Sequence, residues 1–273
     1  MFVFLFGTVV GSFLNVVVYR LGTGERIGRS RSRCFSCGAM LQWYDLIPLV
    51  SFILQKGRCR YCGSKISIQY PVVEFITGLV FMFVTWNIFQ NFQFSIFNFQ
   101  SIFNHSIFKL IYILIIFSLL ISISVYDFRH KIIPNQLVYS FILLTLLFGN
   151  FDFDIWNLFG NWKLEIGNLS THIASGFFAF LSFASLWFFS KGRWMGFGDA
   201  KLALGIGFLL GPWLTAFAVV LSFWIGTLIA VPLVLWRGGG LKTQIPFGPF
   251  LAAGCLTAWL AGDVLRQFYI GLL

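Results

Sequence analysis

The sequence predicts an all-α polytopic membrane protein that crosses the bilayer about eight times and carries a four-cysteine loop between its first two helices. Three observations predict this class. Of the 273 residues, 58% are hydrophobic and only 10% are charged, whereas a soluble domain carries about 25% charged residues. Apolar runs alternate with short polar segments, and nine of the 19 Lys and Arg residues fall within residues 20–65. This composition excludes a soluble enzyme. It also excludes a disordered chain, which needs low hydrophobicity and high charge.

The apolar runs are taken in chain order as membrane spans. The first run has no basic segment before it and no small-residue cleavage site, so we expect a retained helix rather than a signal peptide. The fourth, sixth and eighth runs are short, and tilted, broken or re-entrant helices would account for them. The eight predicted spans cover residues 2–18, 72–88, 110–126, 137–148, 172–190, 202–210, 213–236 and 249–261, with a turn at Gly211-Pro212.

The net charge of +10 predicts an orientation in the membrane rather than binding of nucleic acid. If the spans alternate in direction, residues 19–70, 127–136, 191–201 and 237–248 share one side. These segments hold the nine cations above and seven others, and the opposite side holds three. By the positive-inside rule the cation-rich side is cytoplasmic. We therefore expect membrane lipid as a partner, no nucleic acid, and both termini outside the cytoplasm. The weakly polar segment 89–108 is expected to lie at the opposite interface.

Two of the nine acidic residues lie where a predicted span meets the cytoplasmic face. Asp127 follows the third span and Asp199 precedes the sixth. Ionisable groups at membrane depth are costly and are usually functional. Two carboxyls brought close together can share a proton, so that they activate a water molecule and protonate a leaving amine. The pair therefore predicts an aspartic protease. The alternative for Asp127 is a helix-end charge that is solvated at the interface.

Residues near these acids extend the candidate site. Gly196 and Gly198 precede the second aspartate, and glycine permits unusual backbone angles and the close approach of another chain. Lys201 follows it and either tunes the aspartate or lies at the interface. Glu74 lies one turn inside the second span. It is a candidate for the active cavity or for contact with a cofactor or the substrate amine, and the alternative is a hydrogen-bonded structural acid.

Four of the five cysteines form two Cys-x-x-Cys pairs in the basic loop. A cytoplasmic loop is reducing, so a disulfide framework is not expected. Two pairs separated by 21 residues fit a tetrahedral, four-thiolate zinc site of structural type, which leaves no open position for a catalytic water. The alternatives are a redox-active dithiol and unmetallated thiols. The four cysteines are Cys34, Cys37, Cys59 and Cys62, and Cys255 is expected to be a buried small hydrophobe.

Six segments resemble, in order, the type IV prepilin peptidase family of membrane aspartic proteases with a GxGD motif. They are Gly11-Ser-Phe-Leu-Asn15 with Tyr19-Arg20, the cysteine pairs with Trp43-Tyr44-Asp45 and Ile47-Pro48 between them, Ser67-Ile-Gln-Tyr70-Pro71-Val-Val-Glu74, Asp127 with Ile133-Pro134-Asn135, Gly196-Phe-Gly-Asp199-Ala-Lys201, and Ile245-Pro-Phe-Gly-Pro-Phe250. The chain departs from the family at its start, where members usually have more residues ahead of the first helix. Either the start is truncated or this helix spans poorly.

The resemblance implies an activity and a substrate class. The family cuts prepilins and pseudopilins of pilus or secretion systems, in which a short basic leader precedes a hydrophobic helix. It cuts after the glycine that ends the leader, at the cytoplasmic surface of the bacterial inner membrane. Many members then methylate the new N-terminus with S-adenosylmethionine, for which we assign no residues. The resemblance implies that Asp127 and Asp199 are the catalytic pair. The expected domains are a first helix (1–19), a basic loop (20–70) and a peptidase core of about seven helices (71–273).

Three alternatives remain open. One is a peptidase without methylase activity. Another is a proton-coupled transporter, which predicts acids near mid-membrane and an inverted repeat, whereas the acids here fall at one face and no repeat is evident. The third is a non-catalytic scaffold that recruits partners through the cysteine loop. No nucleophile elbow, Walker loop or HExxH motif occurs in the sequence, which argues against serine hydrolases, P-loop NTPases and zincins.

Overall fold

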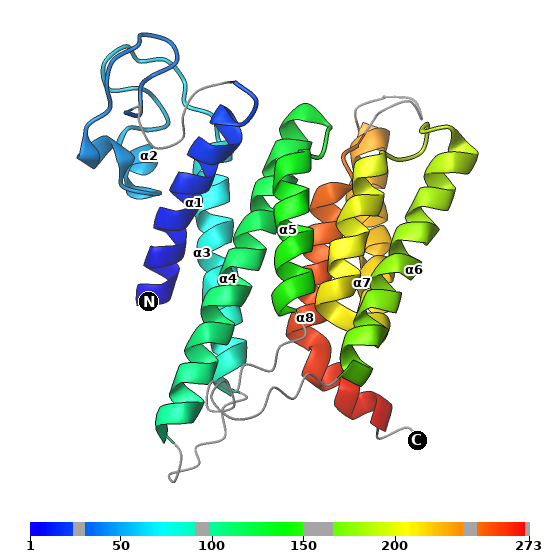
Figure 1. The fold of residues 1–273 in the computed structure, drawn as a ribbon. Helices are drawn as coiled ribbons and strands as arrows, with labels where there is room; N and C mark the ends of the chain where they lie inside the picture. Colours follow the sequence, from blue (N-terminus) through cyan, green and yellow to red (C-terminus); the bar gives the residue numbers. More distant parts are fainter. Residues whose placement is uncertain (24–30, 91–98, 150–165, 237–244, 271–273) are drawn as a thin grey trace. The chain divides into compact units, whose positions relative to one another are not determined.

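The computed structural model describes residues 1–23, 31–90, 99–149, 166–236 and 245–270. Helices dominate this part of the chain, which contains no β-strand beyond two isolated bridges. In chain order the elements are α1 (Phe2–Arg20), the 3-10 turn η1 (Trp43–Leu46), α2 (Val50–Leu54), α3 (Gln69–Gln90), α4 (Phe99–His130), α5 (Asn135–Phe148), α6 (Ile166–Ser190), α7 (Phe197–Trp236) and α8 (Gly248–Ile270), drawn in Figure 1. They form two compact units, Met1–Phe89 and Gln90–Leu273.

The predicted all-α membrane class is confirmed. Among the described residues, five helical segments are long and apolar enough to cross a membrane, and two shorter helices are also apolar. The five are Phe2–Arg20, Gln69–Gln90, Ile107–His130, Leu169–Ser190 and Phe197–Pro232, and the shorter two are Asn135–Phe148 and Gly248–Gly262. The protein is therefore a multi-pass membrane protein. Length and composition do not establish the predicted count of eight crossings.

Much of the predicted segments 89–108 and 149–170 lies outside the described residues, and so do 24–30 and 237–244. Two predicted polar breaks prove shorter than expected. Helix α4 continues to His130, and α7 begins at Phe197. Both aspartates consequently lie within helices, at their ends, rather than in loops.

In the first unit, α1 and α3 pack closely through small residues. A Cβ atom at Gly11 would come within 2.8 Å of the Cα of Glu74, and one at Gly7 would come equally close to the Cα of Gly78. Small residues at such contacts let membrane helices approach. Asn15 is fully buried and donates from Nδ2 to the Tyr70 carbonyl at 3.3 Å, which ties α1 to the start of α3.

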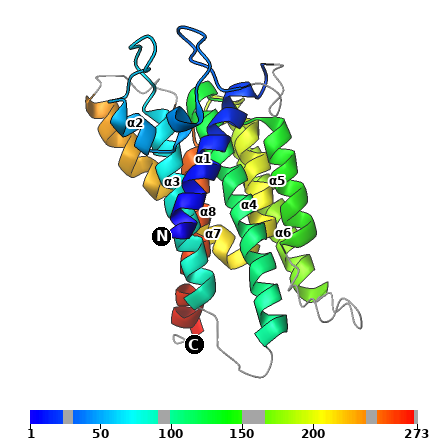
Figure 2. The same cartoon turned by 90° about the vertical axis from the view of Figure 1, so that its left-hand side faces the viewer.

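In the second unit, α7 reverses direction. The predicted spans 202–210 and 213–236 form one helix that is broken at Gly211, where φ is 73° and ψ is −179°. Figures 1 and 2 show the two arms of α7 running in opposite directions, so that α7 begins and ends at the same end of the unit. The first arm packs tightly on α6, since a Cβ at Gly207 would overlap the backbone of Gly176. The predicted turn is confirmed.

Replacing Gly211 by alanine is expected to destabilise the protein by about 1–3 kcal/mol, since only glycine readily adopts this backbone conformation. A Cβ there would also lie 2.8 Å from Nε2 of His172, whose other ring nitrogen is 2.9 Å from the Phe208 carbonyl oxygen. Thermal unfolding in detergent measures the effect. The control is Gly262→Ala on α8, where the new methyl group would meet only the flexible Leu214 side chain. Equal melting temperatures for the two variants would contradict this role of Gly211.

Candidate active site and metal centre

Asp127 lies in the last turn of α4 and is buried. Its Oδ2 accepts a hydrogen bond of 3.0 Å from the backbone N–H of Gly248, the first residue of α8. The first N–H groups of a helix have no partner within the helix and carry a partial positive charge, so they favour a carboxylate. A Cβ at Gly248 would lie 2.7 Å from that oxygen. Glycine at this position therefore lets α8 begin directly against Asp127.

Asp199 lies in the first turn of α7 and is also buried. Its Oδ2 accepts a hydrogen bond of 3.1 Å from the N–H of Gly196, and its own N–H donates to the Gly196 carbonyl at 3.2 Å. The two bonds close a tight turn at the helix start. Gly198 has a different role, since a Cβ there would lie 2.7 Å from the Cβ of Ile133. Its missing side chain lets the segment between α4 and α5 pack against α7.

The two aspartates, 72 positions apart in the sequence, lie at the same end of the second unit. Figure 1 shows the last turn of α4 and the first turn of α7 at that end. Each carboxylate is held by a glycine N–H at the start of a helix or just before one. Two carboxyl groups in this arrangement can share a proton and carry out general acid–base chemistry on a bound amide.

Lys201 contacts the start of α5. Its Nζ donates to Oδ1 of Asn135 at 2.9 Å and to the hydroxyl of Tyr139 at 3.2 Å. It also lies 5.1 Å from the centre of the Tyr139 ring and 5.3 Å from that of Phe197. Within the described part of the chain no ion pair joins it to Asp199. The lysine thus ties the first turn of α7 to α5 and holds the aspartate in place only indirectly.

Glu74 lies in the first unit, on the buried face of α3. Its Oε2 accepts a hydrogen bond of 2.8 Å from the backbone N–H of Leu49. Leu49 has a φ of 60°, a value that is uncommon for a residue other than glycine. The carboxylate therefore holds a strained turn of the cysteine loop on α3, which fits the structural alternative for this acid.

The four loop cysteines come together in the first unit. Their Sγ atoms all lie within 4.8 Å of one another, and those of Cys34 and Cys62 are 3.9 Å apart. With Zn–S bonds of about 2.3 Å, the sulfurs of a tetrahedral zinc site are about 3.8 Å apart. The cluster therefore fits zinc with little adjustment.

The two cysteine pairs adopt the same turn. Gly38 donates its N–H to the Cys34 carbonyl, and Gly63 donates to that of Cys59, both at 2.9 Å. Both glycines have φ near 70°, as 72° and 70°, a conformation that suits glycine. A hydrogen bond from the Cys37 backbone lowers the pKa of the Cys34 thiol to about 6, whereas desolvation and the neighbouring thiols raise the pKa of Cys37 to about 11. A low pKa favours the thiolate form that binds metal.

Asp45 forms an ion pair and hydrogen bonds with several side chains, although it was not among the candidate site residues. Its Oδ1 lies 3.2 Å from Nε of Arg60 and accepts a hydrogen bond from Gln55, while Oδ2 accepts one from Tyr61. Arg60 and Tyr61 are the two residues between Cys59 and Cys62. The buried carboxylate of Asp45 therefore links η1 to the residues between the second pair of cysteines. An aspartate between two cysteine pairs, in a loop rich in arginine, is the signal that could have indicated it.

Two family models match parts of the chain. A model of the bacterial peptidase A24 N-terminal domain matches residues 5–88, which include the four cysteines, and a model of the type IV leader peptidase family matches residues 114–231, which include both aspartates. The chain is 31% identical over 270 residues to the prepilin leader peptidase/N-methyltransferase of Bacillus subtilis, covering 98% of this chain and 96% of the relative.

Proteins with the same name from two other bacteria are also similar over nearly their whole length. The identity is 29% with that of Legionella pneumophila, covering 98% of this chain and 93% of the relative. It is 28% with that of Pseudomonas aeruginosa, with 97% and 91% covered. No solved structure matches the chain. The matched models and the full-length similarity lead to one conclusion: the chain belongs to the type IV leader peptidase family.

Proposed function

We propose that this protein is an intramembrane aspartic endopeptidase that removes the short basic leader of type IV prepilins or pseudopilins and then N-methylates the new N-terminus. The observation that carries the proposal is the pair of buried carboxyls, Asp127 and Asp199, held at one end of the second unit by glycine N–H groups. The similarity to proteins named prepilin leader peptidase/N-methyltransferase supplies the substrate class and the second activity.

In the proposed reaction the two aspartates share one proton. The carboxylate form takes a proton from a water molecule, which attacks the scissile carbonyl carbon. The protonated carboxyl donates its proton to the carbonyl oxygen. When the C–N bond breaks, the amine leaves with a proton from the protonated carboxyl, the other carboxylate takes a proton from a hydroxyl of the tetrahedral diol as the product carboxyl forms, and the starting protonation state returns. The N–H donors of Gly196 and Gly248 hold the carboxylates in position throughout.

The depth of the pair suits a substrate that is anchored by its own helix. Asp127 and Asp199 lie in terminal turns of apolar helices, where a membrane helix meets the interface. A prepilin whose hydrophobic helix lies in the bilayer would present the junction with its leader at that depth. The distribution of Lys and Arg favours the cytoplasmic face of the bacterial inner membrane. We also propose that the substrate is a component of a pilus or of a secretion system.

The four cysteines would hold a structural zinc ion, with all four coordination positions filled by protein. Zinc would fix the fold of the loop and supply no chemistry to cleavage. S-adenosylmethionine would supply the methyl group, and no residues are assigned to it. The division into a first helix (1–19), a loop (20–70) and a core (71–273) stays a prediction. The first compact unit, Met1–Phe89, contains most of α3 together with the loop.

Incubating the purified protein in detergent with a synthetic prepilin tests the proposal, with and without S-adenosylmethionine. We expect one cut at the junction of leader and helix, read from the mass of the product. With S-adenosylmethionine, the product should gain the mass of one methyl group at its N-terminus. An uncut prepilin, with folded enzyme confirmed, would contradict the proposal. A cut product that never gains the methyl group would leave a peptidase without methylase activity.

Replacing Gly248 by alanine should slow prepilin cleavage by about 10²-fold, the size of effect that a misplacement near 1 Å can cause. The added Cβ would lie 2.7 Å from Oδ2 of Asp127 and would push the carboxylate from the helix N-terminus. Single-turnover cleavage measures the change. Gly262→Ala, on the same helix, should cleave at the wild-type rate. A wild-type rate for Gly248→Ala would show that this contact does not position Asp127.

A further inference from the structure

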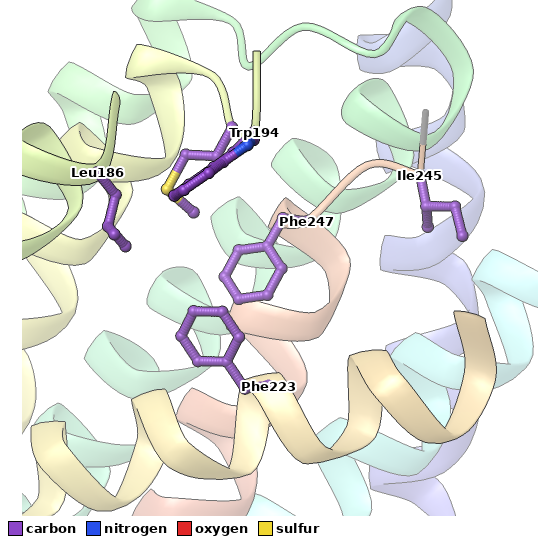
Figure 3. Close-up of a pocket in the computed structure, with 6 residues that line it drawn as sticks. Leu186, Trp194, Phe223, Ile245 and Phe247 are labelled. Carbon is purple, nitrogen blue, oxygen red and sulfur yellow. The ribbon is translucent and has the colours of Figure 1, made fainter. Parts of the chain in front are cut away.

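A cavity of about 310 Å³ that is open on one side lies in the second unit. The six side chains that line it are apolar apart from one indole N–H, and none of them is charged. Figure 3 shows the rings of Phe223 and Phe247 next to one another, facing a space that Trp194 and Leu186 border from the other side. The residues that line the cavity are Leu186, Trp194, Met195, Phe223, Ile245 and Phe247.

Two walls of this cavity belong to the segments that hold the carboxylates. Met195 directly precedes Gly196, whose N–H donates to Asp199. Phe247 directly precedes Gly248, whose N–H donates to Asp127. Consecutive Cα atoms are about 3.8 Å apart. An extended peptide with its scissile bond between the aspartates would therefore pass within a residue or two of the cavity.

The size and chemistry of the cavity indicate what it binds. An apolar cavity of about 150 Å³ is enough to hold a benzene ring, so 310 Å³ accommodates a large apolar side chain. The centres of the Phe223 and Phe247 rings are 5.0 Å apart, and the buried Phe183 ring lies 6.2 and 6.1 Å from them. Such rings pack well against another ring or a branched aliphatic group.

The same lining disfavours the leader side of a prepilin. None of the six lining side chains offers a lysine or arginine an opposite charge, whereas an apolar side chain that packs against the rings loses contact with water at no such cost. The leader is basic, whereas the segment after the scissile bond is hydrophobic. The occupant therefore comes from the hydrophobic side.

We propose that this cavity is a specificity pocket for an apolar side chain in the first helical turn of the substrate's hydrophobic segment, directly beyond the scissile bond. The inference rests on the proposed function and deepens it, because it states on which side of the scissile bond the second unit binds a substrate side chain. The pocket selects large apolar side chains and, by holding one of them, sets the scissile bond between Asp127 and Asp199.

Filling the pocket tests the inference. Leu186→Trp adds bulk to its lining, and the control, Leu181→Trp, makes the same change at a more exposed site on α6, 62% against 38%. Two synthetic prepilins are compared, one with Phe or Leu at the first four positions after the scissile bond and one with Ala at all four. Wild type should prefer the first by at least about tenfold in kcat/KM, in the range that apolar pockets provide.

Leu186→Trp should remove most of that preference, by lowering cleavage of the Phe/Leu substrate and sparing the Ala substrate. Retained cleavage of the Ala substrate also shows that the variant is folded. Leu181→Trp should keep the wild-type preference. Equal loss on both substrates, or no loss on either, would overturn the pocket while leaving the proposed function intact. Failure of wild type to cut either substrate would overturn the proposed function, and the pocket with it.

Photo-crosslinking adds a readout that does not depend on the rate of cleavage. A benzophenone side chain is placed in turn at each of the first four positions after the scissile bond and at the last two leader positions. Asp199→Asn enzyme keeps the substrate uncut. We expect crosslinks to the segments 186–195 and 245–247 from the hydrophobic side, reduced by Leu186→Trp. Crosslinks to these segments from leader positions alone would overturn the proposal.

Discussion

Replacing either Asp127 or Asp199 by asparagine is expected to slow prepilin cleavage by about 10²- to 10⁴-fold, the contribution typical of general acid–base catalysis. Asparagine has nearly the same shape, and its side-chain oxygen can still accept the glycine N–H that each carboxylate binds. It cannot take up or release the proton that the reaction requires. The fold should therefore survive while the chemistry fails. Single-turnover cleavage measures the rate, and circular dichroism with thermal unfolding checks the fold.

The chain offers a matched control for these two changes. Asp263 lies on α8, fifteen positions after Gly248, which corresponds to about 22 Å along a helix. Asp263→Asn makes the same chemical change at that position of α8, and it should cleave at the wild-type rate. The pair would lose its assigned role if either Asp127→Asn or Asp199→Asn cleaved as fast as this control.

The second large effect concerns the metal. Purified protein should contain about one zinc ion per chain, and Cys59→Ser should reduce this sharply, because the four thiolates bind as a set. The two cysteine turns should then lose their fixed arrangement, since the cluster brings their sulfur atoms together. We expect methylation to be lost and cleavage to be retained. Metal analysis and the product mass measure the two outcomes.

Cys255→Ser is the control for the metal experiment. This cysteine is fully buried on α8, outside the cluster. Its replacement should leave the zinc content unchanged. A Cys59→Ser protein with full metal content would remove the zinc proposal. Loss of cleavage along with methylation would show that the peptidase also depends on the loop.

Patterns that are local in the sequence predicted much of this architecture. Long apolar runs predicted α1, α3, α4 and α6 because a membrane helix must be continuous and apolar. The turn at Gly211-Pro212 was predicted because those two residue types interrupt a helix, and the break lies there. The six motif segments predicted the family, which the family models and the relatives confirm. The spacing of the cysteines predicted the thiolate cluster, although the metal itself stays a proposal.

Such local patterns could not predict contacts between segments that are far apart in the sequence. Asp127 and Gly248 are 121 positions apart, and no local signal links them. Lys201 has its partners on α5, 66 and 62 positions earlier. The sequence predicted the segment Ile245-Pro-Phe-Gly248 only as a family motif. In the structure Ile245 and Phe247 line the cavity, and the N–H of Gly248 donates to Asp127.

Two other residues gained roles only from their tertiary contacts. The sequence assigns no role to His172, yet its ring lies against the broken turn of α7. Glu74 holds Leu49 in a conformation that the sequence does not indicate. In both cases the decisive information is the conformation of a neighbouring backbone, which composition and spacing do not encode.

The double variant Asp127→Asn/Asp199→Asn tests whether Asp127 and Asp199 act as one proton-sharing unit. Single-turnover cleavage is compared among wild type, the two single variants and the double variant. Residues that act as a unit lose their function together, so the double variant should cleave within about threefold of the slower single variant. If instead the two losses multiply, with the double variant far slower than either single variant, the aspartates act independently and the account is wrong.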